Sequence, residues 1–121
     1  MQMDIFPMAN KLEIRNAKAL LAGYRKTKAA ANEFERRGLN NLAPSQTIKY
    51  NALQERVQAI ESAVRLILDP DVRQIIETRY IKGERHKITI MRFSNYHEVT
   101  VGRKLNEGIE SVANSLKLLT E

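Results

Sequence analysis

The sequence predicts an all-α protein in which a long N-terminal helical hairpin is followed by three further helices. Two observations carry this prediction. Apolar residues recur at intervals of three and four along most of the 121 residues, as they do on one face of a helix. Breaking residues stand between the periodic stretches, namely Gly38, Pro44, Pro70 and Gly83. We divide the chain into residues 1–68, the hairpin, and residues 69–121.

The first expected helix covers residues 8–37. Pro7 or Met8 opens it, and Gly38 stops it because glycine accepts the backbone conformation of a helix C-cap. Its apolar side is thin, so this helix must lie against another element to be stable. The opposite side is strongly basic, and it serves equally well as a solubilising face or as a phosphate-contacting one.

The second expected helix covers residues 46–68, with Ser45 as its N-cap. Its apolar residues alternate by three and four, as in a heptad seam: Tyr50, Leu53, Val57, Ile60, Val64 and Ile67. Leaving six such side chains in water would cost many kcal/mol, at about 0.8 kcal/mol per methylene. An antiparallel hairpin with the first helix would cover the seam within one chain. A homodimer through residues 50–67 would cover it between two chains.

The third expected helix covers residues 71–82. Pro70 suits a first helical turn, and the carboxylates of Asp69 and Asp71 suit the positive end of the helix dipole. Gly83 ends the helix.

Residues 86–93 and 96–119 form the last two expected helices, joined by a polar turn at Ser94 and Asn95. We expect Asn95 to cap the long helix, with Glu98 completing a capping box. The layout of two short helices leading into a longer one is typical of a helix–turn–helix.

The packing of this second half can also be predicted. Its core should include four residues that hold the last helix against the two before it: Tyr80, Ile90, Val101 and Leu105. Two glycines interrupt the last helix. Gly102 would allow close approach of DNA or of a neighbouring helix, or it is a tolerated cost, and Gly108 is expected to mark a bend.

Positive charge gathers on the proposed helix–turn–helix. The chain carries a net charge of +6, and residues 79–104 hold seven Lys or Arg against two acidic residues. This distribution favours a polyanionic partner. A solvated basic face would explain the charge but not the helical layout around it.

The stretch from Leu68 to Gly83 resembles the start of the sigma-factor region-four module, in which a leucine-proline-acidic start leads into a helix ending in Arg-Tyr and glycine. Here Arg79 and Tyr80 are followed by Ile81, Lys82 and then Gly83. Thr100 and Val101 are similar to the Thr-Val near the start of that module's recognition helix. The chain as a whole resembles ArpU-type regulators of phage late genes, although His97 stands where that family favours serine. The resemblance implies a transcriptional regulator of a phage or prophage in the cytoplasm of a bacterial host, binding double-stranded DNA alone or beside RNA polymerase.

The last helix, from about residue 96, is expected to lie in the major groove. Its candidates for base contacts are the side chains near its exposed first turns: His97, Glu98, Thr100, Arg103 and Lys104. Candidates for phosphate contacts lie in and around the preceding helix: Arg85, His86, Lys87, Arg92 and Asn95.

We expect no enzymatic activity, cofactor or metal. The two histidines have no carboxylates at metal-ligand spacing, and the chain holds no cysteine and no phosphate-cradling glycine loop. No apolar run approaches the ~20 residues of a membrane span. The alternative function is a non-enzymatic helical protein-interaction or assembly module with a basic surface.

Overall fold

The structure is a computed structural model that describes residues 6–93 and 95–120, and these residues form helices and turns with no strand. The all-α prediction is confirmed. The helices are α1 (Lys11–Ala22), α2 (Tyr24–Arg37), α3 (Pro44–Arg65), α4 (Pro70–Ile76), α5 (His86–Arg92) and α6 (Glu98–Thr120). A 3-10 turn, η1 (Leu39–Asn41), follows α2, and a π-helical turn, η2 (Glu77–Ile81), extends α4. Within the same residues, no helix combines the length and apolar character needed to cross a membrane.

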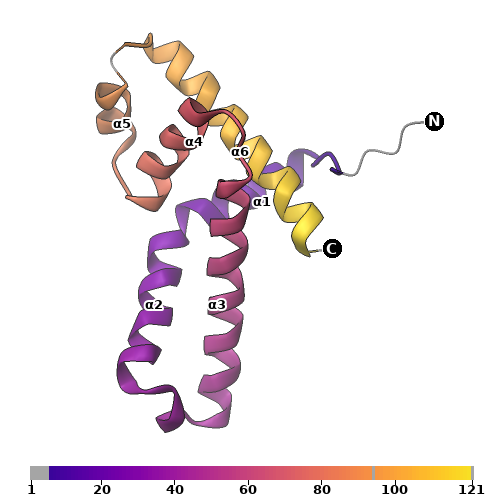
Figure 1. The fold of residues 1–121 in the computed structure, drawn as a ribbon, viewed down its shortest axis with the longest axis vertical. Helices are drawn as coiled ribbons and strands as arrows, with labels where there is room; N and C mark the ends of the chain where they lie inside the picture. Colours follow the sequence, from indigo (N-terminus) through magenta and orange to yellow (C-terminus); the bar gives the residue numbers. More distant parts are fainter. Residues whose placement is uncertain (1–5, 94, 121) are drawn as a thin grey trace, which may run out of the picture.

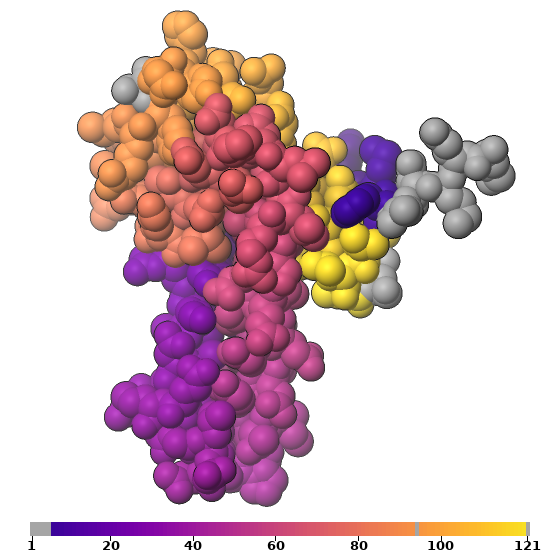
Figure 2. All heavy atoms as spheres, in the orientation of Figure 1, coloured from indigo at the N-terminus to yellow at the C-terminus, as the bar shows by residue number. Residues whose placement is uncertain are grey.

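Helices α2 and α3 lie side by side and antiparallel, and they project from a wider body that the other helices form (Figure 1). Figure 2 shows this projection as a narrow arm below the body. α6 crosses the body and contacts α1, α3 and α4. One buried cluster therefore takes side chains from residues 1–68 and from residues 69–121.

The N-terminal helix bends at Gly23, which divides the predicted helix over residues 8–37 into α1 and α2. The Gly23 carbonyl accepts hydrogen bonds from the backbone N–H and from the hydroxyl of Thr27, each at 3.0 Å. A threonine hydroxyl bonded to the carbonyl four residues earlier often bends a helix. The bend lets α1 pack on α6 while α2 packs on α3. The prediction of one continuous helix is wrong for this reason.

α1 begins at Lys11, later than the predicted opening at Pro7 or Met8. The Asn10 side chain accepts a hydrogen bond from the Glu13 N–H at 2.8 Å, and the Glu13 carboxylate accepts one from the Asn10 N–H at 2.9 Å. This reciprocal capping box satisfies donors that a helix start leaves unpaired, and so it fixes the start of α1.

The start of α1 is also tied to the end of α6. Lys117 Nζ donates to Glu13 Oε1 at 3.0 Å, and Asn114 Oδ1 accepts from the Ala9 N–H at 2.7 Å. These contacts join residues more than 100 positions apart in the chain. They fix the position of α1 relative to α6.

α3 begins at Pro44, one residue before the predicted cap Ser45. Proline suits the first helical position, where a missing N–H costs no hydrogen bond. The Gln46 side chain accepts from the Ala43 N–H at 3.0 Å, which places the cap at Ala43. The Ser45 cap is therefore wrong, because Pro44 already starts the helix.

The apolar seam of α3 is covered within the chain along most of its length. Four of its six residues are buried: Val57, Ile60, Val64 and Ile67. Half-buried Tyr50 meets Phe34 of α2 edge-on, with ring centroids 6.3 Å apart, and its hydroxyl donates to Glu35 at 2.8 Å. A homodimer through residues 50–67 would have to compete with these intrachain contacts.

The start and the end of the third helix follow the prediction. Asp69 is the N-cap, and its carboxylate accepts from the N–H groups of Asp71 and Val72 at 2.9 and 3.3 Å. Gly83 has a φ of 74°, the left-handed conformation predicted for its position. Between them the helix widens into η2, which the sequence pattern did not predict.

α6 begins at Glu98, where the Val101 N–H donates to the His97 carbonyl at 3.0 Å. Asn95 lies in the turn, so the predicted Asn95 cap is wrong. The Tyr96 N–H donates to the Phe93 carbonyl at 3.0 Å, which closes a tight turn before the helix can start. Ser94, the other residue of the predicted polar turn, lies outside the described residues.

The predicted core of the second half is confirmed. Tyr80, Val101 and Leu105 are buried in the main cluster, and Ile90 is half-buried against it.

Gly108 lies where α4 crosses α6, and α6 continues as one helix from Glu98 to Thr120. A Cβ at Gly108 would lie 2.3 Å from Ile76 Cγ1 and 3.1 Å from Val72 Cγ1. The expected bend at Gly108 is thus wrong, since the glycine instead allows two helices to approach closely. At Gly102 a Cβ would meet nothing within 4 Å, so no neighbouring helix requires that glycine.

Replacing each of the two glycines of α6 by alanine should change the free energy of unfolding in opposite directions. Gly108→Ala should lower the free energy of unfolding by about 1–3 kcal/mol, because the added methyl overpacks against buried Ile76. Gly102→Ala, the matched control, should raise it by about 0.5–1 kcal/mol through helix propensity. Urea unfolding of both variants measures the difference, and equal effects would contradict the close crossing.

The ion pair between Glu13 and Lys117 should make the stability of the folded chain depend on pH in the acidic range. The Asn10 N–H and then the Lys117 ammonium lower the pKa of Glu13 below 4.5. The contribution of the ionised Glu13 carboxylate to folding stability is therefore present above pH 4.5 and is lost as the pH falls through the lowered pKa. Glu13→Gln keeps a capping-box side chain but loses the ion pair. This substitution should lower the midpoint of thermal unfolding at neutral pH, and the decrease should be smaller at acidic pH.

The matched control is Glu55→Gln, because Glu55 is an exposed carboxylate on α3. A Glu13→Gln difference that stayed constant from neutral pH to well below pH 4.5 would contradict the assignment.

Candidate nucleic-acid interface

The first turns of α6 present an exposed strip opposite the core. Val101 and Leu105 are buried and face inward. Each residue advances about 100° around a helix, so Val99 and Arg103 lie together on the outer side, four residues apart. Both are exposed. An exposed strip at a helix start is the part that enters the major groove in helix–turn–helix proteins.

The predicted base-contacting residues fall into two groups. His97, Glu98 and Arg103 are exposed, whereas Thr100 and Lys104 are half-buried. Arg103 lies farthest from the core side of the helix. Thr100 and Lys104 share one flank, four residues apart, and therefore border the outer strip instead of forming its centre.

Tyr96 organises that flank. Its hydroxyl donates to the carboxylate of Asp71 at the start of α4, a bond that raises the pKa of Tyr96. The ammonium of Lys104 lies 5.3 Å from the Tyr96 ring centroid, within range of a cation–π interaction. Tyr96 thus joins the turn before α6 to α4 and holds Lys104 on its ring. Sequence reasoning missed it, although an aromatic residue inside a polar turn is an unusual signal.

The predicted phosphate-contacting residues are all exposed: Arg85, His86, Lys87, Arg92 and Asn95. Arg85 precedes the first turn of α5, and His86 and Lys87 begin it. Arg92 is engaged within the chain, because its Nη2 and Nε donate to Glu84 Oε1 at 2.7 and 3.1 Å. A phosphate would have to share or displace this ion pair.

Carboxylates limit the strip along α6. Glu107 and Glu110 are exposed on the same outer side, one and two turns beyond Arg103. Negatively charged carboxylates repel the negatively charged phosphates of a nucleic-acid backbone. These carboxylates therefore repel a polyanion from the outer side of α6 beyond Arg103.

Two exposed apolar side chains near the turn were also missed. Val99 is 83% exposed and Met91 is 62% exposed. Val99 stands two residues before Val101, off the buried stripe, and this spacing was the signal that could have identified it. An apolar side chain at that position suits the methyl group of thymine.

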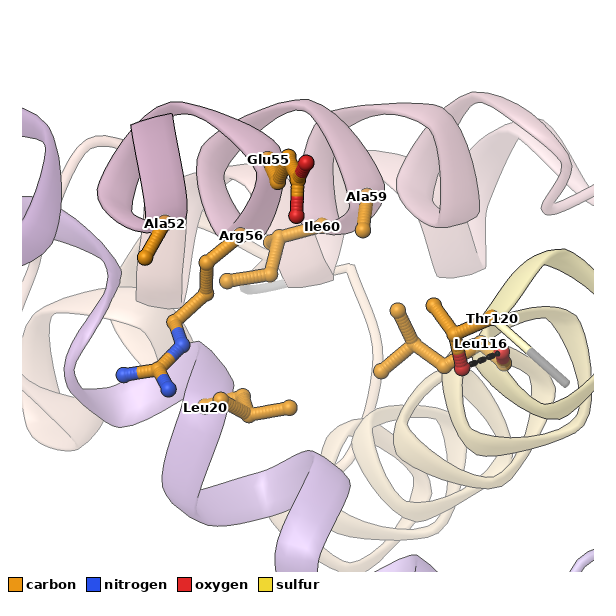
Figure 3. A pocket seen from close by; sticks show the side chains of 8 residues that line it. All are labelled: Leu20, Ala52, Glu55, Arg56, Ala59, Ile60, Leu116 and Thr120. Atoms are coloured by element: carbon orange, nitrogen blue, oxygen red, sulfur yellow. Dashed lines mark hydrogen bonds between the residues drawn. The ribbon is translucent and has the colours of Figure 1, made fainter. Parts of the chain in front are cut away.

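A separate hollow of about 400 Å³ lies between α1, α3 and the end of α6 (Figure 3). Its lining is mainly aliphatic, including Leu20, Ile60 and Leu116, with Glu55 and Arg56 at its border. The Thr120 hydroxyl there donates to the Leu116 carbonyl at 2.6 Å and is thus already bonded. These groups form no arrangement of nucleophile, base and oxyanion donors.

Among residues 6–93 and 95–120, no group of three or more His, Asp or Glu side chains is placed to hold a metal ion. Comparison with known proteins returned no matching family model, no matching curated protein and no matching solved structure.

Tyr96→Phe should loosen the start of α6, because it keeps the ring under Lys104 but removes the bond to Asp71. Amides of the α5–α6 turn and the first turn of α6 should exchange hydrogen faster, as measured by mass spectrometry, while those of α3 stay unchanged. Tyr50→Phe is the matched control, since it removes a similar tyrosine–carboxylate bond at the far arm. Unchanged protection at the turn in Tyr96→Phe would refute this role.

Proposed function

We propose that the chain is a sequence-specific, double-stranded DNA-binding regulator of transcription that inserts the first turns of α6 into the major groove. The observation that carries this proposal is the exposed strip of Val99 and Arg103 on a helix that buried Val101 and Leu105 hold in place. The exposed cations at the start of α5, the helix that precedes α6 in the chain, would supply phosphate contacts.

The side chains divide into those that read bases and those that hold phosphates. Arg103 suits the O6 and N7 atoms of guanine, and Val99 suits a thymine methyl. His97 and Glu98 are exposed at the start of α6, and Thr100 and Lys104 lie on one flank of the helix, with Lys104 against the Tyr96 ring. Contacts to phosphates fix register without reading sequence.

The regulatory role rests on the resemblance of residues 68–83 to the sigma-factor region-four module. The same resemblance supports a phage or prophage origin, the bacterial cytoplasm as location, and RNA polymerase as a further partner. Asp69, Pro70 and Gly83, which carry the resemblance, adopt the cap and stop positions that a helix over this stretch requires.

A helical protein-interaction module is the second candidate, and exposed Met91 and Val99 favour it. Apolar side chains on a surface near cations also suit a protein partner with an acidic, partly apolar face. Steep salt dependence of binding to duplex DNA distinguishes the first candidate from the second.

Substitutions on α6 and α5 should affect binding differently. Arg103→Ala should cost about 1–3 kcal/mol at one position of the preferred site and relax the preference there. Lys87→Ala should weaken binding to all duplexes similarly and reduce the salt slope by about one unit. Selection of bound DNA from a random pool supplies the site, and binding to its single-base variants at several salt concentrations measures both effects.

Lys49→Ala is the matched control, because Lys49 is exposed in the second turn of α3, close to the connection between α2 and α3. If Arg103→Ala and Lys87→Ala both bound every duplex as the wild type does, α6 would not occupy the groove.

A further inference from the structure

A second hollow, of about 370 Å³, lies beside the start of α6 and joins the N-terminal helices to the proposed DNA-binding region. Four elements line it: α1 through Lys18, η2 through Arg79 and Tyr80, α5 through His86, and α6 through Gly102, Leu105, Asn106 and Ile109. The hollow therefore brings a cation from residues 1–68 next to the helix–turn–helix region.

The lining suits an anion. Two of the eight residues are cationic, Lys18 and Arg79, and none is acidic. Arg79 is held in place, because its Nη1 donates to the Glu84 carbonyl at 3.2 Å and its guanidinium lies 5.1 Å from the Tyr80 ring centroid. The nearby carboxylate of Glu84 is already paired with Arg92. Positive charge in the hollow is thus not neutralised by its own lining.

Gly102 lines the hollow and leaves the space next to its Cα empty. A Cβ there would meet nothing within 4 Å, so the α6 backbone can be approached closely. Asn106 lies one turn beyond, is exposed, and carries amide N–H donors. A bulky tetrahedral group such as a phosphate can therefore reach polar donors without displacing a side chain.

A second N-terminal cation lies close by. The side chain of Arg25 in α2 covers Gly83, with Arg25 Cδ 2.4 Å from the position a Cβ on that glycine would take. The connection that leads into α5 is thus bordered by an arginine of the N-terminal helices. Lys18 and Arg25 together extend the basic surface beyond the helix–turn–helix itself.

We propose that one phosphodiester strand of the bound duplex passes over this hollow and contacts Lys18 of α1, together with His86 and Asn106. This inference rests on the proposed function. Asn106 lies about 60° around α6 from Arg103, so a strand bordering the groove that Arg103 reads reaches the hollow next. Glu107 and Glu110 repel the strand from the outer side of α6 beyond Arg103, whereas no acidic side chain lines the hollow.

The placement of Lys18 is fixed by the fold. The Glu13–Lys117 and Ala9–Asn114 contacts attach α1 to α6, so the backbone of α1 that carries exposed Lys18 is held relative to α6. A preorganised phosphate contact costs less ordering on binding than one from a loose terminal arm. The basic side of α1 is then part of the DNA-binding surface, besides any role in solubility.

The test measures binding of the intact chain to its selected duplex across a range of salt concentrations. Lys18→Gln should weaken binding to every duplex and reduce the slope of log affinity against log salt by about one unit. Asn106→Asp, which places a carboxylate in the hollow, should weaken binding further at low salt. Lys49→Gln, which removes the same charge from the far arm, should leave the slope unchanged. Circular dichroism melts establish that each variant folds.

Each outcome decides between the two proposals. If Arg103→Ala loses specificity while Lys18→Gln keeps the wild-type slope, the strand does not cross the hollow, and the proposed function stands without this inference. If the wild type binds no duplex with measurable salt dependence, the proposed function fails and this inference fails with it. A titration of the chain with inorganic phosphate is the last measurement of this test. Saturable amide shifts at Gly102 and Asn106 with phosphate, combined with an unchanged duplex slope in Lys18→Gln, would assign the hollow to free phosphate and overturn the inference.

Discussion

The close crossing of α4 and α6 at Gly108 is the contact on which the rest of the structure depends. With no side chain at Gly108, buried Ile76 and Val72 lie directly against the α6 backbone. The crossing fixes α6 against α4, and the same helix packs on α1 and α3 toward its C-terminal end. A larger residue would separate the two helices and shift the start of α6 relative to α5.

α6 therefore has two functions in the fold. Its C-terminal half belongs to the core that it shares with α1 and α3, where Val112, Ala113 and Leu116 are buried. Its first turns carry exposed polar side chains on one side only. Since one helix joins the two halves, the position of Arg103 is set by adjacent Val101 and Leu105 and also by the packing of the C-terminal half. An N-terminal hairpin that supports α6 in this way acts as a scaffold for the exposed strip.

The cations of the surface differ in how freely they can meet a partner. Lys104 lies on the Tyr96 ring, Arg92 is paired with Glu84, and Arg79 is bonded to a carbonyl. Arg103, Lys87 and Lys18 are exposed. Net charge alone does not distinguish the engaged cations from the exposed ones. This distinction decides which residues lose an existing contact when a polyanion binds. Exposed ion pairs contribute little to stability, so the paired arginine can be recruited at small cost.

The sequence by itself determined the all-α class, the buried stripes of α3 and α6, the acidic helix start at Pro70 and the stop at Gly83. These features depend on periodicity and on local backbone preferences, which neighbouring residues specify. Tertiary structure alone decided the bend at Gly23, the role of Gly108 and the start of α6. Each of these depends on where a second element lies: α1 and α2 pack on different helices, Ile76 occupies the space above Gly108, and Tyr96 reaches across to Asp71. The candidate residues were likewise identifiable by charge and position, whereas Lys18 joined them only because folding brings α1 beside α6.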